Sequence, residues 1–413
     1  MLDPNVVEEI IKLIKRGEKP SRYKVAERFG ISEAQARSYI AIAQYVVERE
    51  NEKKEETISR QLSSIKKREE KERLTHEFFL NVLEKAVREF PVPDRIKPPI
   101  RRVRSVGEEV AVILCSDWHI GEVVRPEQVS NVNVFNENVA ASRLELFATK
   151  IVELVELQRH YTSINKAVIW LGGDMVSGVI HEELKDTAIL LAVEQTALAG
   201  YLMAQFIAEV STLFREVVVI TTVGNHGRLS KKRAFKTHTV NNLDYVAYQI
   251  CAFALRNYKH IRFYVDASIF RFADVNGWRF VFSHGDETRS WMQIPFYGLR
   301  RDYASKQAIN VYVHNNGDLT GAVQPVNYKV IGHFHTTGLI PDNYGFIIMN
   351  GSLKGVDEFS FTKGFISRPS QYLFGVHKEY GVTFNYPVWL DKAKDTPSRY
   401  VVDVPDVWAD MEI

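Results

Sequence analysis

Short apolar runs rich in β-branched residues recur along the chain, and they alternate with longer segments of helical periodicity. The apolar runs lie at residues 110–114, 167–171, 217–223, 280–282 and 329–331. The helical segments lie at about residues 140–160, 187–214 and 241–257. Beyond residue 260 strand-like runs predominate, at residues 261–265, 269–273, 279–282 and 346–349. Alternation followed by successive strands predicts an α/β fold with layered, mixed sheets.

The first 46 residues have a different pattern, which is helical throughout. Apolar residues at helical spacing predict a first helix that ends near Gly17. A second, short helix is expected to end at Gly30, which can take a positive φ in a tight turn. Ile31 then fills the core, and Ser32 can cap a third helix. The small side chain of Ala26 lets two of these helices cross closely.

This pattern resembles a helix-turn-helix, a motif that places its second helix in the major groove of DNA. The side chains expected to face the groove are Ser32, Glu33, Gln35 and Arg37. The alternative is a three-helix interaction module that uses the same turn without contacting DNA. The sequence therefore predicts an N-terminal all-α domain over residues 1–46, with DNA as its expected partner.

Residues 47–104 join this domain to the remainder of the chain. A long charged helical arm is expected over residues 45–90, because apolar residues are sparse in most of that range. Such a helix serves as a spacer or as an arm that pairs with another copy of the chain, so a homo-oligomer is one predicted state. Four prolines then mark a linker before the body at residues 105–413: Pro91, Pro93, Pro98 and Pro99.

Composition narrows the class of protein. The chain has 413 residues, of which 45% are hydrophobic and 25% charged, and these values indicate a globular protein large enough for more than one domain. No window holds the roughly 18 uninterrupted apolar residues of a membrane span, and the charged N-terminus is unlike a signal peptide. Cys115 and Cys251 are expected to be core residues in a reducing compartment, which predicts a cytoplasmic location.

The net charge of +2 conceals an asymmetry between the two ends of the chain. Residues 1–104 contain 24 Lys and Arg against 18 Asp and Glu, whereas residues 105–413 contain 29 against 33. A basic N-terminal part beside a mildly acidic body favours contact with nucleic acid, although a solvated basic face gives the same excess.

Five short clusters of metal-ligating residues accompany the apolar runs. They are Asp117-Trp118-His119, Gly172-Gly173-Asp174, Gly224-Asn225-His226, His284 and Gly332-His333-Phe334-His335. Each cluster follows or ends one of the runs, and oxygen and imidazole ligands at the ends of successive strands can assemble a metal site on a rigid sheet. Mixed ligation by His, Asp and Asn suits Mn, Fe or Zn better than Ca or Mg.

The five clusters together resemble the calcineurin-like metallophosphoesterase superfamily over roughly residues 108–355. The resemblance implies a four-layer αββα sandwich of two mixed sheets, with two divalent metal ions at the strand ends and Mn as the first expectation. It also implies the ligands of each ion. Asp117, His119 and His335 would hold one metal, Asn225, His284 and His333 would hold the other, and Asp174 would bridge them.

The resemblance further implies phosphoester hydrolysis by a metal-bridging hydroxide, with His226 as the general acid that protonates the leaving oxygen. Many relatives orient this histidine with a nearby carboxylate. In this chain Gly227 and residues 175–178 stand where that carboxylate is usually found, so its identity is open. The candidates are Glu182, Asp186, Asp286 and Glu287.

Two basic segments beside the clusters indicate the substrate. The expected substrate contacts are His181, Arg228, Lys231, Lys232, Arg233, Arg289, Arg300 and Arg301. Trp291, Phe296 and Tyr297 lie among them, and cations interleaved with aromatic residues suit a nucleic-acid groove. Ordinary solvated loops are the alternative.

These features predict a metal-dependent phosphodiesterase that acts as a DNA nuclease, similar in kind to double-strand-break repair nucleases and their phage-type relatives. The repair enzymes carry a capping domain after the last motif, whereas only residues 356–413 remain here, which argues against a role in a repair complex. Two alternatives stay open. One is a phosphatase or small-molecule phosphodiesterase whose N-terminal region serves assembly, and the other is a DNA-binding regulator with a vestigial metal site.

Overall fold

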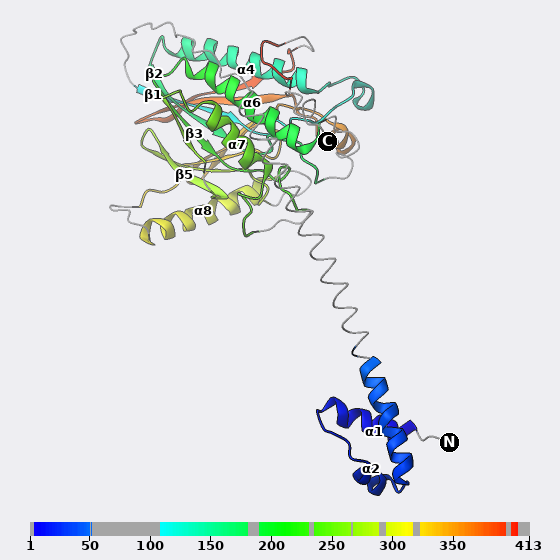
Figure 1. The fold of residues 1–413 in the computed structure, drawn as a ribbon. Coiled ribbons are helices and arrows are strands. Elements are labelled where there is room, and N and C mark those ends of the chain that lie inside the picture. The colour runs from blue at the N-terminus through cyan, green and yellow to red at the C-terminus, as the bar shows by residue number, and fades with distance from the viewer. Residues whose placement is uncertain are drawn as a thin grey trace. The chain divides into compact units, whose positions relative to one another are not determined.

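The computed structural model describes residues 4–49, 51, 108–180, 190–230, 235–265, 267–288, 295–316, 323–393 and 398–403. The chain divides into two compact units, Met1–Leu80 and Asn81–Ile413. Figure 1 traces the chain from blue at the N-terminus to red at the C-terminus. Most of the predicted arm and linker at residues 47–104 lies outside the described residues.

Three helical segments form the described part of the N-terminal unit: α1 (Pro4–Lys15), α2 (Arg22–Phe29) and residues 33–49. They pack around a small apolar core that includes Ile10, Val25 and Tyr39. Gly30 ends α2 with a left-handed backbone (φ 63°), and its N–H donates to the carbonyl of Ala26. The predicted helix end and turn are therefore present.

Ser32 and Gln35, two of the predicted DNA contacts, also cap the third helical segment. The main-chain N–H of Gln35 donates to Oγ of Ser32 (3.3 Å), and the N–H of Ser32 donates to Oε1 of Gln35 (3.0 Å). This reciprocal pair is a capping box, so both side chains have a structural role. Arg37 is exposed on the same segment. Contact between this unit and DNA stays a prediction.

Six strands form the first sheet of the larger unit, in the order β11-β10-β1-β2-β3-β4. They are β1 (Glu108–Cys115), β2 (Ser163–Leu171), β3 (Glu216–Thr221), β4 (Ile261–Tyr264), β10 (Ser370–His377) and β11 (Gly381–Trp389). Strands β1 to β4 are parallel, so each connection crosses over the sheet. The crossovers contain α4 (Glu137–Gln158), α6 (Ala192–Ser211) and α7 (Leu243–Ala254). A short 3₁₀ helix, η1 (Pro126–Val129), precedes α4.

Five strands form the second sheet, in the order β5-β6-β7-β9-β8. They are β5 (Phe270–Val275), β6 (Trp278–Ser283), β7 (Tyr328–Ile331), β8 (Gly338–Asp342) and β9 (Gly345–Met349). The central strands β6, β7 and β9 are parallel, and the two edge strands are antiparallel to their neighbours. Two helices belong to this half of the chain: α8 (Phe296–Asn316) lies between β6 and β7, and α9 (Glu358–Lys363) follows β9.

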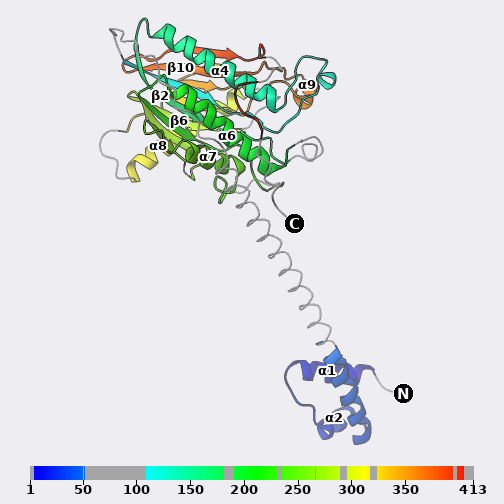
Figure 2. The ribbon, with the colours of Figure 1, turned by 45° about the horizontal axis from the view of Figure 1, so that its top comes forward.

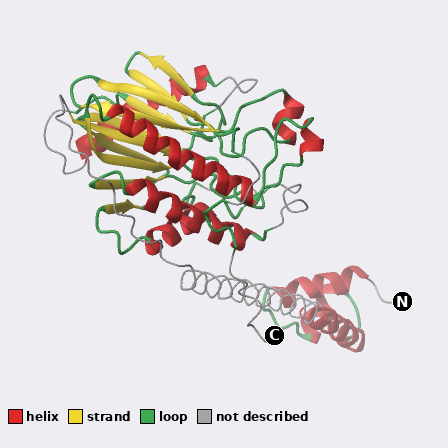
Figure 3. Cartoon of the chain, turned by 90° about the horizontal axis from the view of Figure 1, so that it is seen from above, coloured by secondary structure: helices red, strands yellow, loops and turns green. Residues whose placement is uncertain are grey.

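The two sheets pack face to face through an apolar core, to which β1 contributes Val112 and Leu114 and β6 contributes Phe280 and Phe282. Figures 1 and 2 show α4 and α6 side by side along the first sheet. On the other side, α8 packs on the second sheet through Leu299 and its neighbours. Figure 3 shows the yellow strands flanked by red helices. The predicted four-layer αββα sandwich, the fold expected of a metallophosphoesterase, is confirmed.

Two parts of this fold were absent from the sequence prediction. Helix α8 occupies a segment interpreted from sequence only as basic and aromatic. The β10–β11 hairpin occupies the tail after residue 356, and β10 pairs directly with β1 at the middle of the first sheet. Among the described residues, no helix is long and apolar enough to cross a membrane.

Candidate metal centre

The carboxyl ends of β1 and β2 meet, and their main-chain pairing continues beyond the strands. The N–H of Asp117 donates to the carbonyl of Gly173 (2.9 Å), and the N–H of His119 donates to the carbonyl of Asp174 (3.0 Å). This continued pairing holds the first two ligand clusters side by side.

The loops after β6 and β7 bring the last two clusters to the same edge from the second sheet. The N–H of Gly332 donates to the carbonyl of His284 (2.8 Å). The N–H of His333 lies within hydrogen-bonding distance of both carboxylate oxygens of Asp117, at 3.0 and 3.2 Å. Asp117 is thereby tied to the opposite sheet, and the strand ends of both sheets form one site.

Three overlapping groups of ligand atoms occupy this edge, and within each group the atoms lie within 4.8 Å of one another. The groups are Asp117, His119 and His335; His119, Asp174 and His226; and Asp174, His284 and His333. The first group is the predicted ligand set of one metal. The third contains two predicted ligands of the other metal together with Asp174. Asp174 also belongs to the second group, so its carboxylate lies between the two predicted metal positions.

Oδ1 of Asn225, one of the predicted ligand atoms, is buried without a hydrogen-bond partner. Nδ1 of His284 donates to the carbonyl of Gly172 (2.8 Å), and Nε2 lies 3.0 Å from Oδ2 of Asp174. A buried polar atom without a partner costs about 1–3 kcal/mol, and a bound cation would satisfy Oδ1 of Asn225. The donor set of imidazole, carboxylate and carboxamide fits a divalent ion such as Mn, Fe or Zn.

The backbone at the site is strained. Five of the predicted ligands have a positive φ, namely Asp117 (56°), His119 (50°), Asp174 (52°), His333 (67°) and His335 (54°). Residues with a side chain rarely adopt this conformation, which costs about 1–3 kcal/mol and persists where the surrounding structure enforces it. The concentration of such residues at one edge of the sandwich is typical of a functional site.

Burial and charge divide the histidines of the site into two kinds. Burial and the charge of Lys354 hold the pKa of His119 well below its ordinary value, and burial and the charge of His284 lower the pKa of His333 to about 4. Both are therefore neutral near pH 7, which is the form that binds a metal. Burial opposes charge on His284 as well, but the carboxylate of Asp174 outweighs it and raises the pKa of His284 well above the ordinary value. A metal that binds His284 must displace a proton.

Asp244, which the sequence did not single out, holds two of the ligand loops together. Its Oδ2 accepts from the N–H groups of Asp174 and Gly224 (both 2.9 Å), and its Oδ1 accepts from the N–H of Met175 (3.0 Å). Burial and the charge of Asp174 raise the pKa of Asp244 to about 6. A signal in the sequence was Asn242, which caps α7 and so places Asp244 in the first turn of a helix.

His226 lies within the site, next to the predicted bridging carboxylate. Its main-chain N–H donates to Oδ1 of Asp174 (2.7 Å). Its ring packs edge-on against the ring of His119, with 4.6 Å between the ring centroids. Nδ1 of His226 lies 2.9 Å from the carbonyl oxygen of Ser177. A main-chain carbonyl thus meets Nδ1 of His226, where an orienting carboxylate was one expectation. Of the proposed candidates, Glu287 lies beside Lys306 instead (3.5 Å); Glu182 and Asp186 fall outside the described residues.

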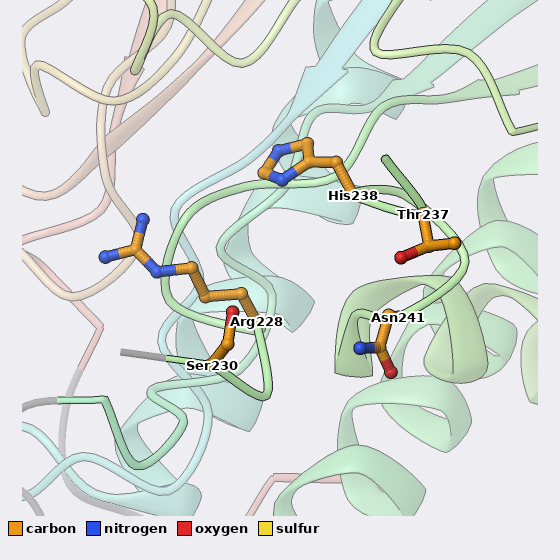
Figure 4. A pocket seen from close by; sticks show the side chains of 5 residues that line it. All are labelled: Arg228, Ser230, Thr237, His238 and Asn241. Atoms are coloured by element: carbon orange, nitrogen blue, oxygen red, sulfur yellow. The ribbon is translucent and has the colours of Figure 1, made fainter. Parts of the chain in front are cut away.

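Arg228 is the predicted substrate contact nearest to His226 in the chain. Its side chain lines a small pocket together with Ser230, Thr237, His238 and Asn241, as Figure 4 shows. Hydroxyl, carboxamide, imidazole and guanidinium groups surround this pocket, and its lining contains no carboxylate. Nε of Arg228 is buried without a hydrogen-bond partner. The pocket therefore offers donors suited to an anion.

The other predicted substrate contacts lie on α8 or outside the described residues. Arg300 and Arg301 lie exposed on α8, where Nε of Arg300 donates to Oδ2 of Asp342 (2.9 Å). Phe296 and Tyr297 are exposed at the start of the same helix. The remaining contacts lie outside the described residues, namely His181, Lys231, Lys232, Arg233 and Arg289.

No known protein-family profile matches the chain, and no curated protein matches it. Similar solved structures include a predicted phosphoesterase of Streptococcus pneumoniae, with 9% identity over 68% of this chain and 98% of its own, at a TM-score of 0.24. Another is Vps29 of Entamoeba histolytica complexed with Zn²⁺, with 11% identity over 68% and 99% and a TM-score of 0.25. A third is an archaeal phosphodiesterase, with 8% identity over 67% and 99% and a TM-score of 0.29.

The two stacked mixed sheets carry the five clusters at strand ends in the expected order, and each of the five contributes at least one residue to the three ligand groups. The fold that the resemblance to the calcineurin-like metallophosphoesterases implied is therefore present. In a metallophosphoesterase-like fold of this kind, the strand ends of both sheets supply the side chains of the site, and the helical layers support it from outside. The helix-turn-helix and the nuclease subtype stay predictions.

Proposed function

We propose that the chain is a metal-dependent phosphodiesterase that hydrolyses phosphodiester bonds of DNA. The observation that carries the proposal is the position of Asp174, which shares one ligand group with His119 and another with His284 and His333. A carboxylate between two sets of imidazole ligands suits a pair of divalent cations, because its two oxygens can serve both. Enzymes with such pairs cleave phosphate esters.

The residues assigned to each metal follow the predicted sets. Asp117, His119 and His335 would hold one ion, Asn225, His284 and His333 would hold the other, and Asp174 would contact both. Mn is the first candidate, with Fe and Zn as alternatives. When bound, the two ions would neutralise the phosphate oxygens and make a water molecule acidic enough to attack phosphorus.

His226 supplies the proton that the leaving oxygen needs. As the ester bond between phosphorus and that oxygen breaks, its electron pair stays on the oxygen, which takes a proton from Nε2 of His226. Hydrolysis thus consumes one water and gives a phosphomonoester and an alcohol. The carbonyl of Ser177 supports this role, because it accepts the Nδ1 hydrogen of the protonated ring and leaves the hydrogen on Nε2 for the leaving oxygen.

The choice of DNA rests on Arg228, on exposed aromatic side chains of α8 and on the N-terminal unit. Arg228 lies two residues from His226 in the chain and adds a cation for a second phosphate, which a polynucleotide has and a simple monoester lacks. Phe296 and Tyr297 are 54% and 82% exposed, which is unusual for side chains of this size and suits stacking on bases. Arg37 on the N-terminal unit adds an exposed cation.

The test compares four substrates with the full chain loaded with Mn²⁺: labelled single-stranded DNA, labelled double-stranded DNA, bis(4-nitrophenyl) phosphate and 4-nitrophenyl phosphate. We expect cleavage of DNA and of the diester dye, and loss of both activities in EDTA. Hydrolysis of the monoester alone would contradict the nuclease proposal and identify a phosphatase. Hydrolysis of the diester dye without cleavage of either DNA would point to a small-molecule phosphodiesterase. A control variant with Asp174→Ala excludes a contaminating nuclease.

A further inference from the structure

Ser177 is held in place through its main chain and its side chain, and it is completely buried. Its N–H donates to the carbonyl of Ile120 (3.0 Å), which continues the pairing between the two ligand loops. Its hydroxyl donates to Oε2 of Glu122 (2.9 Å). Its carbonyl accepts from Nδ1 of His226 (2.9 Å). Ser177 thus connects Glu122 to His226, the predicted general acid, through one side-chain and one main-chain hydrogen bond.

Glu122 is itself fixed by a buried ion pair. Nζ of Lys354 lies 3.0 Å from Oε1 of Glu122 and also pairs with Asp357. Glu122 and Lys354 are 7% and 2% exposed, so water screens their attraction little. The second carboxylate oxygen of Glu122 lies 3.7 Å from Nδ1 of His119, a predicted metal ligand. Glu122 therefore lies next to His119 and is connected to His226 through Ser177.

The residue after Ser177 is also fixed. The N–H of Gly178 donates to Oε1 of Gln195 on α6 (2.9 Å), and the backbone there is left-handed (φ 69°). A Cβ added at Gly178 would lie 2.1 Å from the carbonyl oxygen of His226, so the two segments are in direct contact. The Ser177 carbonyl is therefore anchored on both sides and cannot turn away from the imidazole without breaking these bonds.

We propose that Ser177, locked by its hydrogen bond to Glu122, is the positioning residue of His226 and replaces the carboxylate that orients this histidine in many related enzymes. The inference rests on the proposed function. A carbonyl can only accept a hydrogen bond, so it keeps the hydrogen on Nδ1 and fixes the plane of the ring.

The test uses Ser177→Ala, which removes the bond to Glu122 and keeps the carbonyl. Two diesters that differ in leaving group serve as probes. The nitrophenolate of bis(4-nitrophenyl) phosphate leaves without a proton, whereas the sugar hydroxyl of a thymidine dinucleotide needs one. We expect kcat for the dinucleotide to fall about tenfold, a part of the 10²–10⁴ that general acid catalysis supplies. We expect kcat for the nitrophenyl ester to change less than about twofold, with KM and bound metal unchanged.

Ser211→Ala is the matched control, because Ser211 is a buried serine whose hydroxyl donates to the carbonyl of Ala208 on α6. It should leave both rates unchanged. In a His226→Ala background, Ser177→Ala should have no further effect on the dinucleotide, since the two residues act as one unit. Equal losses on both substrates, or additive losses in the double variant, would overturn the inference. If the unaltered chain hydrolyses neither diester, the proposed function fails instead.

Discussion

The carboxylate of Asp244 accepts a hydrogen bond from the main-chain N–H of Asp174 at 2.9 Å, which puts a second buried acid directly behind the predicted bridging ligand. The same carboxylate binds the N–H groups of Met175 and Gly224. It therefore sets the distance between the loop that carries Asp174 and the loop that carries Asn225. A residue that touches no substrate thus determines the shape of the metal centre.

Asp244→Asn should weaken metal binding and lower the free energy of unfolding. The carboxylate accepts three N–H bonds, whereas a carboxamide must turn its NH₂ toward at least one of these donors. Burying an unpaired N–H costs about 1–3 kcal/mol, and residues that support metal ligands typically change affinity by about 10–100-fold. Urea unfolding and metal titration measure the two effects. Asp391→Asn, in an exposed pair with Arg368, is the control. Normal metal affinity in Asp244→Asn would contradict this role.

His226→Ala and Asp174→Ala should separate catalysis from metal binding. We expect His226→Ala to slow hydrolysis of a diester with a poor leaving group by about 10²–10⁴-fold and to keep its metal, because His226 donates a proton and holds no ion. Asp174→Ala should lose metal, since both predicted ion positions share its carboxylate. Elemental analysis of the purified variants gives the metal content. Loss of metal from His226→Ala would show that this histidine is a ligand.

The side chains that gather at the site could be predicted because each stands directly after an apolar run. Asp117 follows β1 and Asp174 follows β2, so the strand pattern alone places both at one edge of a sheet. Asp244 could not be predicted in this way, since it lies on α7 and reaches the site only through the packing of that helix. The hydrogen-bond partner of His226 could not be predicted either, because Ser177 acts through its main-chain carbonyl and every residue has such a carbonyl.

The parts of the fold that were not predicted from the sequence were missed for a similar reason. Strand β10 pairs with β1 although most of the chain separates the two strands in sequence. A pairing this distant leaves no local pattern in the sequence from which it could be predicted. Both of its faces are covered, so seven of its eight residues are buried and the polar alternation of an exposed strand is absent. Lys329 is the opposite case, a charged residue inside a strand that was predicted correctly. It lies in a run taken as apolar and is completely buried in β7, where Asp302 neutralises it.

Glu287 should contribute stability that disappears in acid. Burial opposes its ionisation, but Lys329 and Lys306 outweigh burial and lower the pKa of Glu287 to about 2. A pKa below the unfolded value stabilises the fold above about pH 4.5, and the contribution is lost as the pH falls toward 2. The shift corresponds to about 3 kcal/mol. Glu287→Gln should therefore lower the free energy of unfolding at pH 7, and the difference from the unaltered chain should shrink by pH 3.

Urea unfolding at both pH values measures this difference. Glu153→Gln, in an exposed pair with Lys150, is the control and should change stability by less than about 1 kcal/mol at either pH. A Glu287→Gln effect of the same size at pH 7 and pH 3 would mean that the charge of Glu287 contributes nothing.

Arg37→Ala should weaken binding of double-stranded DNA if the N-terminal unit contacts the phosphate backbone. Loss of one phosphate contact should reduce the slope of log affinity against log salt by about 1, and the loss should be similar for all sequences. Fluorescence anisotropy at several salt concentrations measures the slope. Arg16→Ala removes the same charge from the same unit, at an exposed position beyond α1, and should leave the slope unchanged. Equal effects of both variants would indicate only a general attraction to DNA.

Gly173→Ala should disturb the metal centre far more than Gly277→Ala, although both glycines have nearly the same φ, 89° and 90°. Each variant incurs the cost of a side chain in the left-handed region, about 1–2 kcal/mol. At Gly277, in the turn between β5 and β6, the added methyl group meets nothing within 4 Å. At Gly173 it lies 2.3 Å from the main-chain nitrogen of Gly224, so the loops that carry Asp174 and Asn225 must separate.

The extra strain should lower the free energy of unfolding of Gly173→Ala by about 1–3 kcal/mol beyond the loss in Gly277→Ala. Metal affinity should fall by at least about tenfold in Gly173→Ala and stay unchanged in Gly277→Ala, because only the first variant moves ligands. Parallel urea unfolding and Mn²⁺ titration of the two variants separate backbone strain from displacement of the ligands. Equal metal affinities would mean that the site tolerates movement of its loops, and the close approach of Gly173 to Gly224 would then have no role in metal binding.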